Sequence, residues 1–208
     1  MEDCVLPVMN TGLRGVDVAS SKICDVKGKQ GKLIYRGFLI EDLAQNAGFE
    51  EVCFLLLYER LPKKKELEAF SLSLKQKRKI PENIFSFLKT LPQDMNPMDV
   101  LQMATPLLIQ NDQTIGEPAI ENVLFSAENI IAGIATITAA WDRIRNKKPI
   151  VSPDNDLNHA TNFLYMLNGV KPDDETAAFF DTSLVLHAEH SFNASTFTAR
   201  QVASTRAH

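Results

Sequence analysis

The residues between Leu186 and Arg200 hold the densest group of side chains that could do chemistry. Two of the four histidines of the chain, His187 and His190, lie here together with the amide of Asn193 and several hydroxyls. The residues before them are typical of a helix, and Asn193 followed by small and hydroxyl residues predicts the N-cap of another. We therefore expect His190 at a corner between two helices. Such a corner offers an imidazole, an amide, hydroxyls and unpaired backbone N–H groups to one anion or carbonyl oxygen.

Other interpretations of these histidines are open from spacing alone. Each could be a satisfied structural histidine, or His187 and His190 could share a metal ion beside Glu189. The zinc signature of two histidines four residues apart around a glutamate is absent, and neither a cysteine pair nor a carboxylate cluster supplies further ligands. We therefore expect no metal site. A serine nucleophile elbow and a glycine-rich phosphate loop are absent as well.

The helix predicted from Pro172 onward should position this corner. Four residues recur along it at helical spacing: Phe179, Ser183, Leu186 and His190. We expect this stripe to face the core. Packing would then hold His190 rigidly at the end of the stripe with its ring toward a cavity, which suits the polarisation of a substrate carbonyl.

The composition is that of an ordinary soluble globular protein. Hydrophobic residues make up 45% of the 208 and charged residues 23%, with a net charge of −4. No overall basic field is present to gather nucleic acid or an acidic membrane surface. The three cysteines are odd in number and lack paired spacing, which indicates free thiols in a reducing compartment. Because no signal or transit peptide is visible at the acidic N-terminus, we expect a cytoplasmic protein without nucleic-acid or membrane partners.

The pattern along the chain predicts a mainly α fold with one small hairpin. Two short strands around a glycine-containing turn give a hairpin within about residues 17–37, and helical periodicity continues over about 38–208. The longest predicted helix spans about 117–145 and carries one apolar stripe: Ile120, Leu124, Ala127, Ile131, Ile134, Thr138, Trp141 and Ile144, widened by Ile130, Ile137 and Ala140. This stripe favours a domain core or a subunit interface. Its most apolar part, 130–141, is shorter than the roughly 20 residues of a membrane span.

Local signals describe three of the other predicted helices. Asn96 followed by Pro97 predicts an N-cap and the first helical position. The basic residues within 63–79 surround an apolar stripe, which favours a solvated face over a patch for a phosphorylated ligand. His159, in a helix predicted over about 156–168, is expected to be an ordinary polar or capping histidine.

The stretch from His187 to Arg200, with Val202–Thr205 after it, resembles the histidine motif of prokaryotic-type citrate synthases and 2-methylcitrate synthases. Further segments that resemble the family occur upstream in the family's order: Gly12–Val16, Tyr35–Gly37 with Ile40–Leu43, Phe49–Val52 with Leu55–Tyr58, and Pro97–Leu101. The resemblance covers nearly the whole chain, from about residue 6 to residue 208.

This resemblance implies an almost all-α, dimer-forming acyltransferase of the tricarboxylic acid cycle. Such an enzyme condenses oxaloacetate with acetyl-CoA and hydrolyses the thioester to give citrate and CoA, with acetyl-CoA as a co-substrate and no further cofactor. The resemblance assigns His190 to the binding of oxaloacetate and product, and places Asn193 near the substrate in the same turn. It assigns Ser195 a catalytic role, in which the serine helps to orient a catalytic histidine. His187 is expected to be structural support.

The chain also departs from the family. The glycine-flanked catalytic histidine, a second histidine, the catalytic aspartate and the carboxylate-binding arginines follow the motif in the family, whereas this sequence ends at His208. We therefore expect residues 1–208 to be the N-terminal part of the citrate synthase large domain, truncated before the rest of the fold and inactive in isolation. The alternatives are a fragment of a 2-methylcitrate synthase that uses propionyl-CoA, or a non-catalytic helical oligomerisation module.

Overall fold

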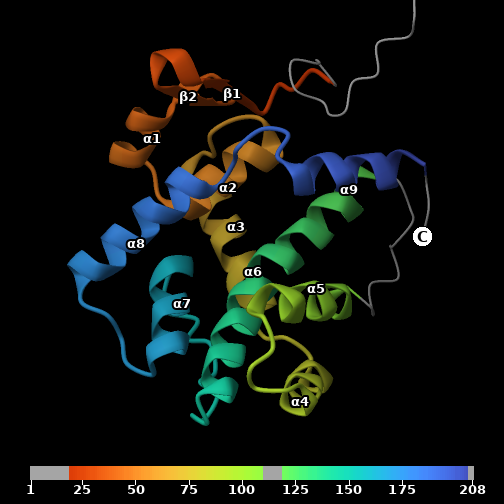
Figure 1. The fold of residues 1–208 in the computed structure, drawn as a ribbon. Helices are drawn as coiled ribbons and strands as arrows, with labels where there is room; N and C mark the ends of the chain where they lie inside the picture. Colours follow the sequence, from red (N-terminus) through yellow and green to blue (C-terminus); the bar gives the residue numbers. More distant parts are fainter. Residues whose placement is uncertain (1–18, 110–118, 206–208) are drawn as a thin grey trace, which may run out of the picture.

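The computed structural model describes residues 19–109 and 119–205. In these ranges the protein is mainly helical, with one small antiparallel sheet at the N-terminal side (Figure 1). The predicted mainly α fold is confirmed. The segment Gly12–Val16 and the predicted start of the long helix near Glu117 lie outside the described residues.

The sheet has the strand order β1-β2-β3. Strands β1 (Cys24–Lys27) and β2 (Lys32–Tyr35) pair antiparallel, with Cys24 opposite Tyr35. The short 3-10 helix η1 (Gly28–Gln30) connects them, so the predicted hairpin is confirmed. A third strand, β3 (Phe38–Leu39), was not predicted, since two residues are too few to give an alternating pattern.

The helices follow closely on one another. Their bounds are α1 Ile40–Asn46, α2 Phe49–Tyr58, α3 Lys64–Lys77, α4 Glu82–Thr90, α5 Pro97–Leu108, α6 Ile120–Arg145, α7 His159–Asn168, α8 Asp174–His187 and α9 Ala194–Ser204. The predicted start of α5 is confirmed: Asn96 accepts a hydrogen bond from the Met98 N–H at 2.9 Å, and Pro97 is the first helical residue.

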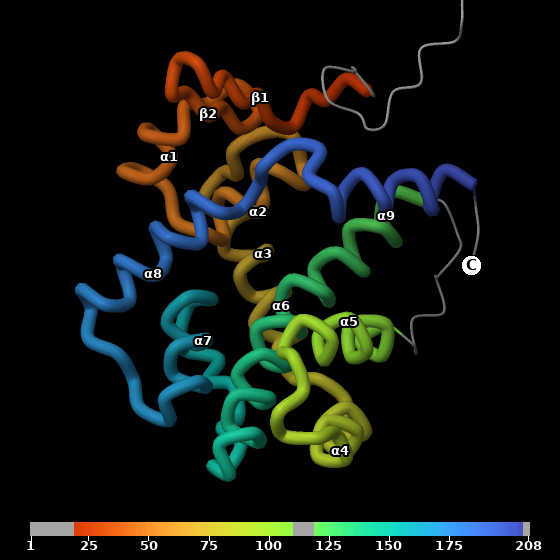
Figure 2. Tube along the Cα trace, viewed as in Figure 1, coloured from red at the N-terminus to blue at the C-terminus, as the bar shows by residue number. Residues whose placement is uncertain are grey.

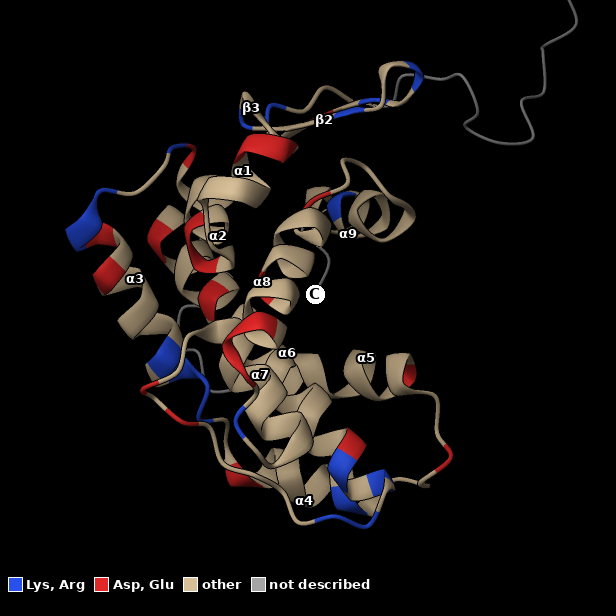
Figure 3. Ribbon diagram, turned by 90° about the vertical axis from the view of Figure 1, so that its left-hand side faces the viewer, with Lys and Arg blue, Asp and Glu red and all other residues tan. Residues whose placement is uncertain are grey.

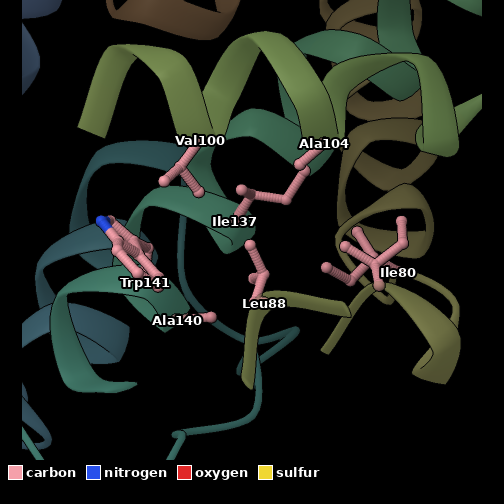
Figure 4. Packing of buried hydrophobic residues seen from close by; sticks show 8 residues of the cluster. Ile80, Leu88, Val100, Ala104, Ile137, Ala140 and Trp141 are labelled. Atoms are coloured by element: carbon pink, nitrogen blue, oxygen red, sulfur yellow. The ribbon is translucent and has the colours of Figure 1, made fainter. Parts of the chain in front are cut away.

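The long helix α6 is the centre of the fold, and α3, α4, α5 and α7 all pack against it. Its largest core cluster draws on α4, α5, α6 and the connection before α4: Ile80, Ile84, Leu88, Val100, Ala104, Ile137, Ala140 and Trp141. In Figure 4, Val100 and Ala104 point from α5 toward Ile137. By length and composition alone α6 could cross a membrane, as can the core helix of a soluble protein. Its packing against four helices accounts for the apolar composition.

The buried face of α6 matches the predicted stripe only in part. Ile137, Ala140 and Trp141 are buried as predicted, but Ile131 and Ile134 are only half-buried and Ile120 is 61% exposed. The buried face consists mainly of small residues: Ala132, Gly133, Ala135, Thr136, Ala139 and Ala140. Small side chains let neighbouring helices come close. The packing of α6 therefore buries its small residues more fully than most of the large residues in the predicted stripe.

A second cluster joins the sheet to α1, α2 and α8. It consists of Cys24, Tyr35, Ile40, Leu43, Val52, Leu55 and Val185. Tyr35, Val52, Leu55 and Val185 are fully buried. The sheet is thereby anchored on α8, the helix that leads into the histidine stretch.

A buried polar junction around Glu50 connects α2, α3 and α7. Glu50 accepts hydrogen bonds from the backbone N–H of His159 (2.8 Å), from an Arg78 guanidinium nitrogen (3.4 Å) and from the Ser71 hydroxyl. The lysines at the start of α3 are exposed, and acidic residues follow them along the helix (Figure 3). Two basic residues at the end of α3 are different. Lys77 is largely buried and pairs with Glu128, and Arg78 is fully buried and donates to the Leu157 carbonyl at 2.7 Å, so the expected solvated face includes neither.

His159 is buried, with its ring 5.2 Å from that of Phe49. Burial lowers the pKa of His159 to about 4, and the nearby charge of Arg78 acts in the same direction. The imidazole is therefore neutral in the folded chain at neutral pH. This is a structural histidine, as expected, although it is more deeply buried than an ordinary capping residue.

Gly133 allows α5 to approach α6. A Cβ added at Gly133 would lie 2.5 Å from Leu108 Cδ2 and 3.1 Å from its Cγ, so the whole leucine side chain would have to move. We expect Gly133→Ala to lower the free energy of unfolding by about 1–3 kcal/mol through overpacking. The higher helix propensity of alanine offsets at most about 1 kcal/mol of this loss. Denaturant unfolding measures the net change. Leu108→Ala in the same chain should abolish the penalty, and Gly28→Ala, with nothing within 4 Å of the added Cβ, serves as the control.

The pH dependence of stability tests the assignment of His159. Because its pKa in the folded chain lies below the ordinary 6.5, the unfolded state takes up the proton first as the pH falls. The free energy of unfolding should therefore fall by at most about 3 kcal/mol as the pH is lowered from about 6.5 to 4. His159→Phe keeps an aromatic ring but cannot be protonated, so urea titrations at several pH values should show a smaller fall for this variant. Burial raises the pKa of Asp181, which makes the free energy of unfolding change with pH in the opposite direction. Because both proteins contain Asp181, this contribution cancels when the two are compared. Equal pH profiles for the two proteins would contradict the assignment.

Candidate substrate-binding corner

The histidine stretch forms a corner between α8 and α9. Helix α8 ends at His187, the chain bends through residues 188–193, and α9 begins at Ala194 (Figure 2). Asn193 is the N-cap of α9, and its Oδ1 accepts a hydrogen bond from the Thr196 N–H at 2.9 Å. The predicted N-cap and the predicted position of His190 between two helices are both confirmed.

The predicted core-facing stripe on α8 is wrong. Phe179 is 77% exposed, Leu186 is 44% exposed and His190 is exposed as well. The fully buried residue of α8 is Val185, one position away from the predicted stripe. Apolar residues lie on every side of this helix, so their periodicity could not define a single buried face. His190 is therefore available to solvent instead of being packed at the end of a buried row.

The three predicted site residues share this exposed corner. His190 lies in the bend, Asn193 at the N-cap and Ser195 in the first turn of α9, and all three are exposed. His187 lies one turn back, where its Nδ1 is 2.7 Å from the Ser183 carbonyl oxygen. That bond within α8 agrees with a supporting role for His187.

Backbone polarity at the start of α9 favours an anionic ligand. The first turn of α9 carries no acidic residue, so no carboxylate within the helix offsets the positive end of its dipole. The guanidinium of Arg200 lies 5.2 Å from the ring centre of Phe192, which adds a cation beside the corner. An imidazole, an amide and a hydroxyl next to a helix N-terminus can together bind carboxylate and carbonyl oxygens.

Residues of the sheet support the corner, and local sequence patterns did not predict this contact. The Tyr35 hydroxyl is 2.9 Å from the Glu189 carbonyl oxygen and 3.2 Å from that of Leu186. Burial raises the pKa of the Cys24 thiol, nearby Glu189 adds to this rise, and an interaction with the Ser191 backbone opposes it. The sequence separation of about 150 residues leaves no local signal, although Tyr35 does belong to one of the segments that resemble the family.

Comparison with known proteins identifies the family. The family profile described as "Citrate synthase, C-terminal domain" matches residues 12–208. The chain is 41% identical to a citrate synthase of Haloferax volcanii over 201 residues, which cover 95% of this chain and 53% of that protein. It is 37% identical to a 2-methylcitrate synthase of Mycobacterium tuberculosis, covering 96% of this chain and 50% of that protein.

Solved structures agree with the sequence comparison. The crystal structure of citrate synthase from Thermotoga maritima superposes with a TM-score of 0.84 at 33% identity, covering 96% of this chain and 52% of that one. The chain thus spans about half the length of the relatives it matches. The placement of residues 1–208 within one part of the large domain stays a prediction. The extent of the match in sequence and in fold shows that this chain belongs to the citrate synthase family.

Proposed function

We propose that this chain provides the oxaloacetate-binding corner of an acyltransferase of the citrate synthase type. The reaction condenses oxaloacetate with acetyl-CoA and releases citrate and CoA. The observation that carries the proposal is the exposed corner at the start of α9, where His190, Asn193 and Ser195 lie together in a chain of this family. No cofactor beyond the acyl-CoA co-substrate is proposed.

Each of the three residues has a chemical role in this proposal. The His190 imidazole donates a hydrogen bond to oxaloacetate and to the product, where it stabilises negative charge on oxygen. Asn193 holds the turn through its cap and offers its amide N–H₂ group to the same ligand. Ser195 orients a catalytic histidine, and is the residue of the three assigned to catalysis.

Acetyl-CoA is the proposed acyl donor in preference to propionyl-CoA. Citrate synthases from Haloferax volcanii and Acidithiobacillus ferridurans are 41% and 40% identical to this chain. The 2-methylcitrate synthases from Mycobacterium tuberculosis and Shewanella oneidensis are 37% and 34% identical. The difference is small but consistent. Parallel assays with the two acyl-CoA thioesters distinguish the two activities.

Replacement of His190 tests the proposed site. We expect His190→Ala in the complete protein to weaken oxaloacetate binding by roughly tenfold or more, because a hydrogen bond to a charged ligand is worth about 1.5–3 kcal/mol. The exposed side chain contributes little to packing, so the melting temperature should stay unchanged. Calorimetric titration with oxaloacetate measures the affinity, and release of free CoA thiol measures the condensation.

His187→Ala is the matched control, since this exposed histidine bonds within α8. It should leave oxaloacetate affinity unchanged. If both variants bind oxaloacetate like the wild type, His190 is not a substrate residue. The 208-residue chain alone is expected to release no thiol from acetyl-CoA, and turnover by this chain would contradict its proposed dependence on further catalytic groups.

We also propose that the protein assembles with itself through the start of α6, which exposes large apolar side chains. The exposed fractions there are 61% for Ile120 and 55% for Val123. Clustered exposed apolar residues of this kind are typical of protein interfaces. A homodimer, as the resemblance implies, would bury them.

Light scattering at several concentrations tests this assembly. The wild-type chain should scatter as a dimer or larger species, and Val123→Glu should shift it toward the monomer because burial of an unpaired carboxylate is costly. Val170→Glu, at a position that is 67% exposed in the connection between α7 and α8, is the control and should have no effect. A wild-type chain that is monomeric at all concentrations would refute the proposal.

A further inference from the structure

The Tyr35 hydroxyl lies at the end of α8, next to His190. Tyr35 is fully buried, yet its hydroxyl reaches three backbone groups of the corner. It is 2.9 Å from the Glu189 carbonyl oxygen and 3.2 Å from the Leu186 carbonyl oxygen, and it accepts a hydrogen bond from the Glu189 N–H at 3.2 Å. A single phenol therefore holds both backbone polar groups of the residue that precedes His190.

These bonds replace hydrogen bonds that the end of a helix lacks. The last carbonyl groups of an α-helix have no partner within the helix. Leu186 is in the last turn of α8, and Glu189 follows the C-cap residue Ala188. The phenol thus fixes the direction in which the chain leaves α8 and enters the corner.

Tyr35 is itself rigidly placed. It pairs with Cys24 across the antiparallel strands β1 and β2, and both belong to the buried cluster that includes Val185. Ala188 packs against this cluster from the corner side. A side chain fixed on a sheet and packed on all sides can hold a bend more precisely than a loop residue can.

The backbone on the other side of His190 needs such support. Ser191 has a φ of 58°, in the left-handed region that residues with a side chain seldom adopt. Its carbonyl accepts a hydrogen bond from the Asn193 N–H at 3.0 Å, which leads directly into the N-cap of α9. His190 thus lies between Glu189, which Tyr35 holds, and a residue in an unfavourable conformation.

From this geometry we infer that Tyr35 is a positioning residue for His190. It does not touch the substrate; it fixes the backbone on which the imidazole is carried, and so presets the direction in which His190 meets oxaloacetate. The inference rests on the proposed function for the role of His190, but the position of the imidazole can be measured without any ligand.

The test compares Tyr35→Phe with Tyr58→Phe. Each variant removes one phenol hydroxyl that bridges distant elements, and the Tyr58 hydroxyl bonds to Glu128 Oε1 at 3.1 Å, in the junction between α2 and α6 and away from the corner. The first measurement is the NMR spectrum of the histidine rings in isotope-labelled chain, with the His190 signals assigned through His190→Gln. We expect Tyr35→Phe to shift or broaden the His190 signals and Tyr58→Phe to leave them unchanged.

The second measurement is the affinity for oxaloacetate. Tyr35→Phe should weaken binding about fivefold, which corresponds to one hydrogen bond of about 1 kcal/mol. Tyr58→Phe should not weaken it. A purely structural role for Tyr35 would lower the melting temperature of both variants alike and leave the His190 signals as in the wild type.

The outcomes separate the inference from the proposed function. Unchanged His190 signals in a folded Tyr35→Phe chain would overturn the inference, whatever the affinity. Shifted signals in a protein that binds no oxaloacetate would support the positioning role and refute the proposed function. Should Tyr35→Phe fail to fold, Val52→Ala loosens the buried cluster around Tyr35 from the side of α2 and should shift the same signals. Unchanged signals in that variant would equally overturn the inference.

Discussion

The close packing of helices on the small-residue face of α6 is the constraint on which the rest of this fold depends. Gly133 leaves room for Leu108 at the end of α5. Ala132 belongs to a buried cluster with residues of α3, and Ala140 belongs to one with residues of α4 and α5. Larger residues on this face would separate these helices and open cavities between them. The position of α7, and through it that of α8, follows from this packing.

The corner at the end of α8 depends on a second, polar set of contacts. Val185 anchors the last turns of α8 in the cluster under the sheet, and the Tyr35 hydroxyl bonds to the backbone just beyond them. Helix α9 itself has no buried residue. The proposed site is thus exposed on one side for a ligand and held on the other by a sheet more than 150 residues earlier in the chain.

The junction around Glu50 shows how buried charge is accommodated in the same fold. Its carboxylate bonds to the first residue of α7 and to the buried guanidinium of Arg78, which also bonds to the Leu157 carbonyl oxygen. A buried guanidinium without such partners would be strongly destabilising. These bonds connect α2, α3 and the start of α7 where apolar contacts alone would not define their relative positions.

The sequence by itself determined the mainly helical class, the hairpin, the cap of α5 at Asn96, the cap of α9 at Asn193 and the family, because caps, turns and motifs are local in the chain. It did not determine which faces are buried. The large apolar residues predicted a stripe on α8 that is largely exposed and a stripe on α6 that is buried only in part, since small residues allow closer contact and leave no periodic signal of their own. The exposure of His190, the burial of Arg78 and the contact of Tyr35 with Glu189 were decided only by the tertiary structure. Each depends on residues distant in sequence that come together only when the helices pack.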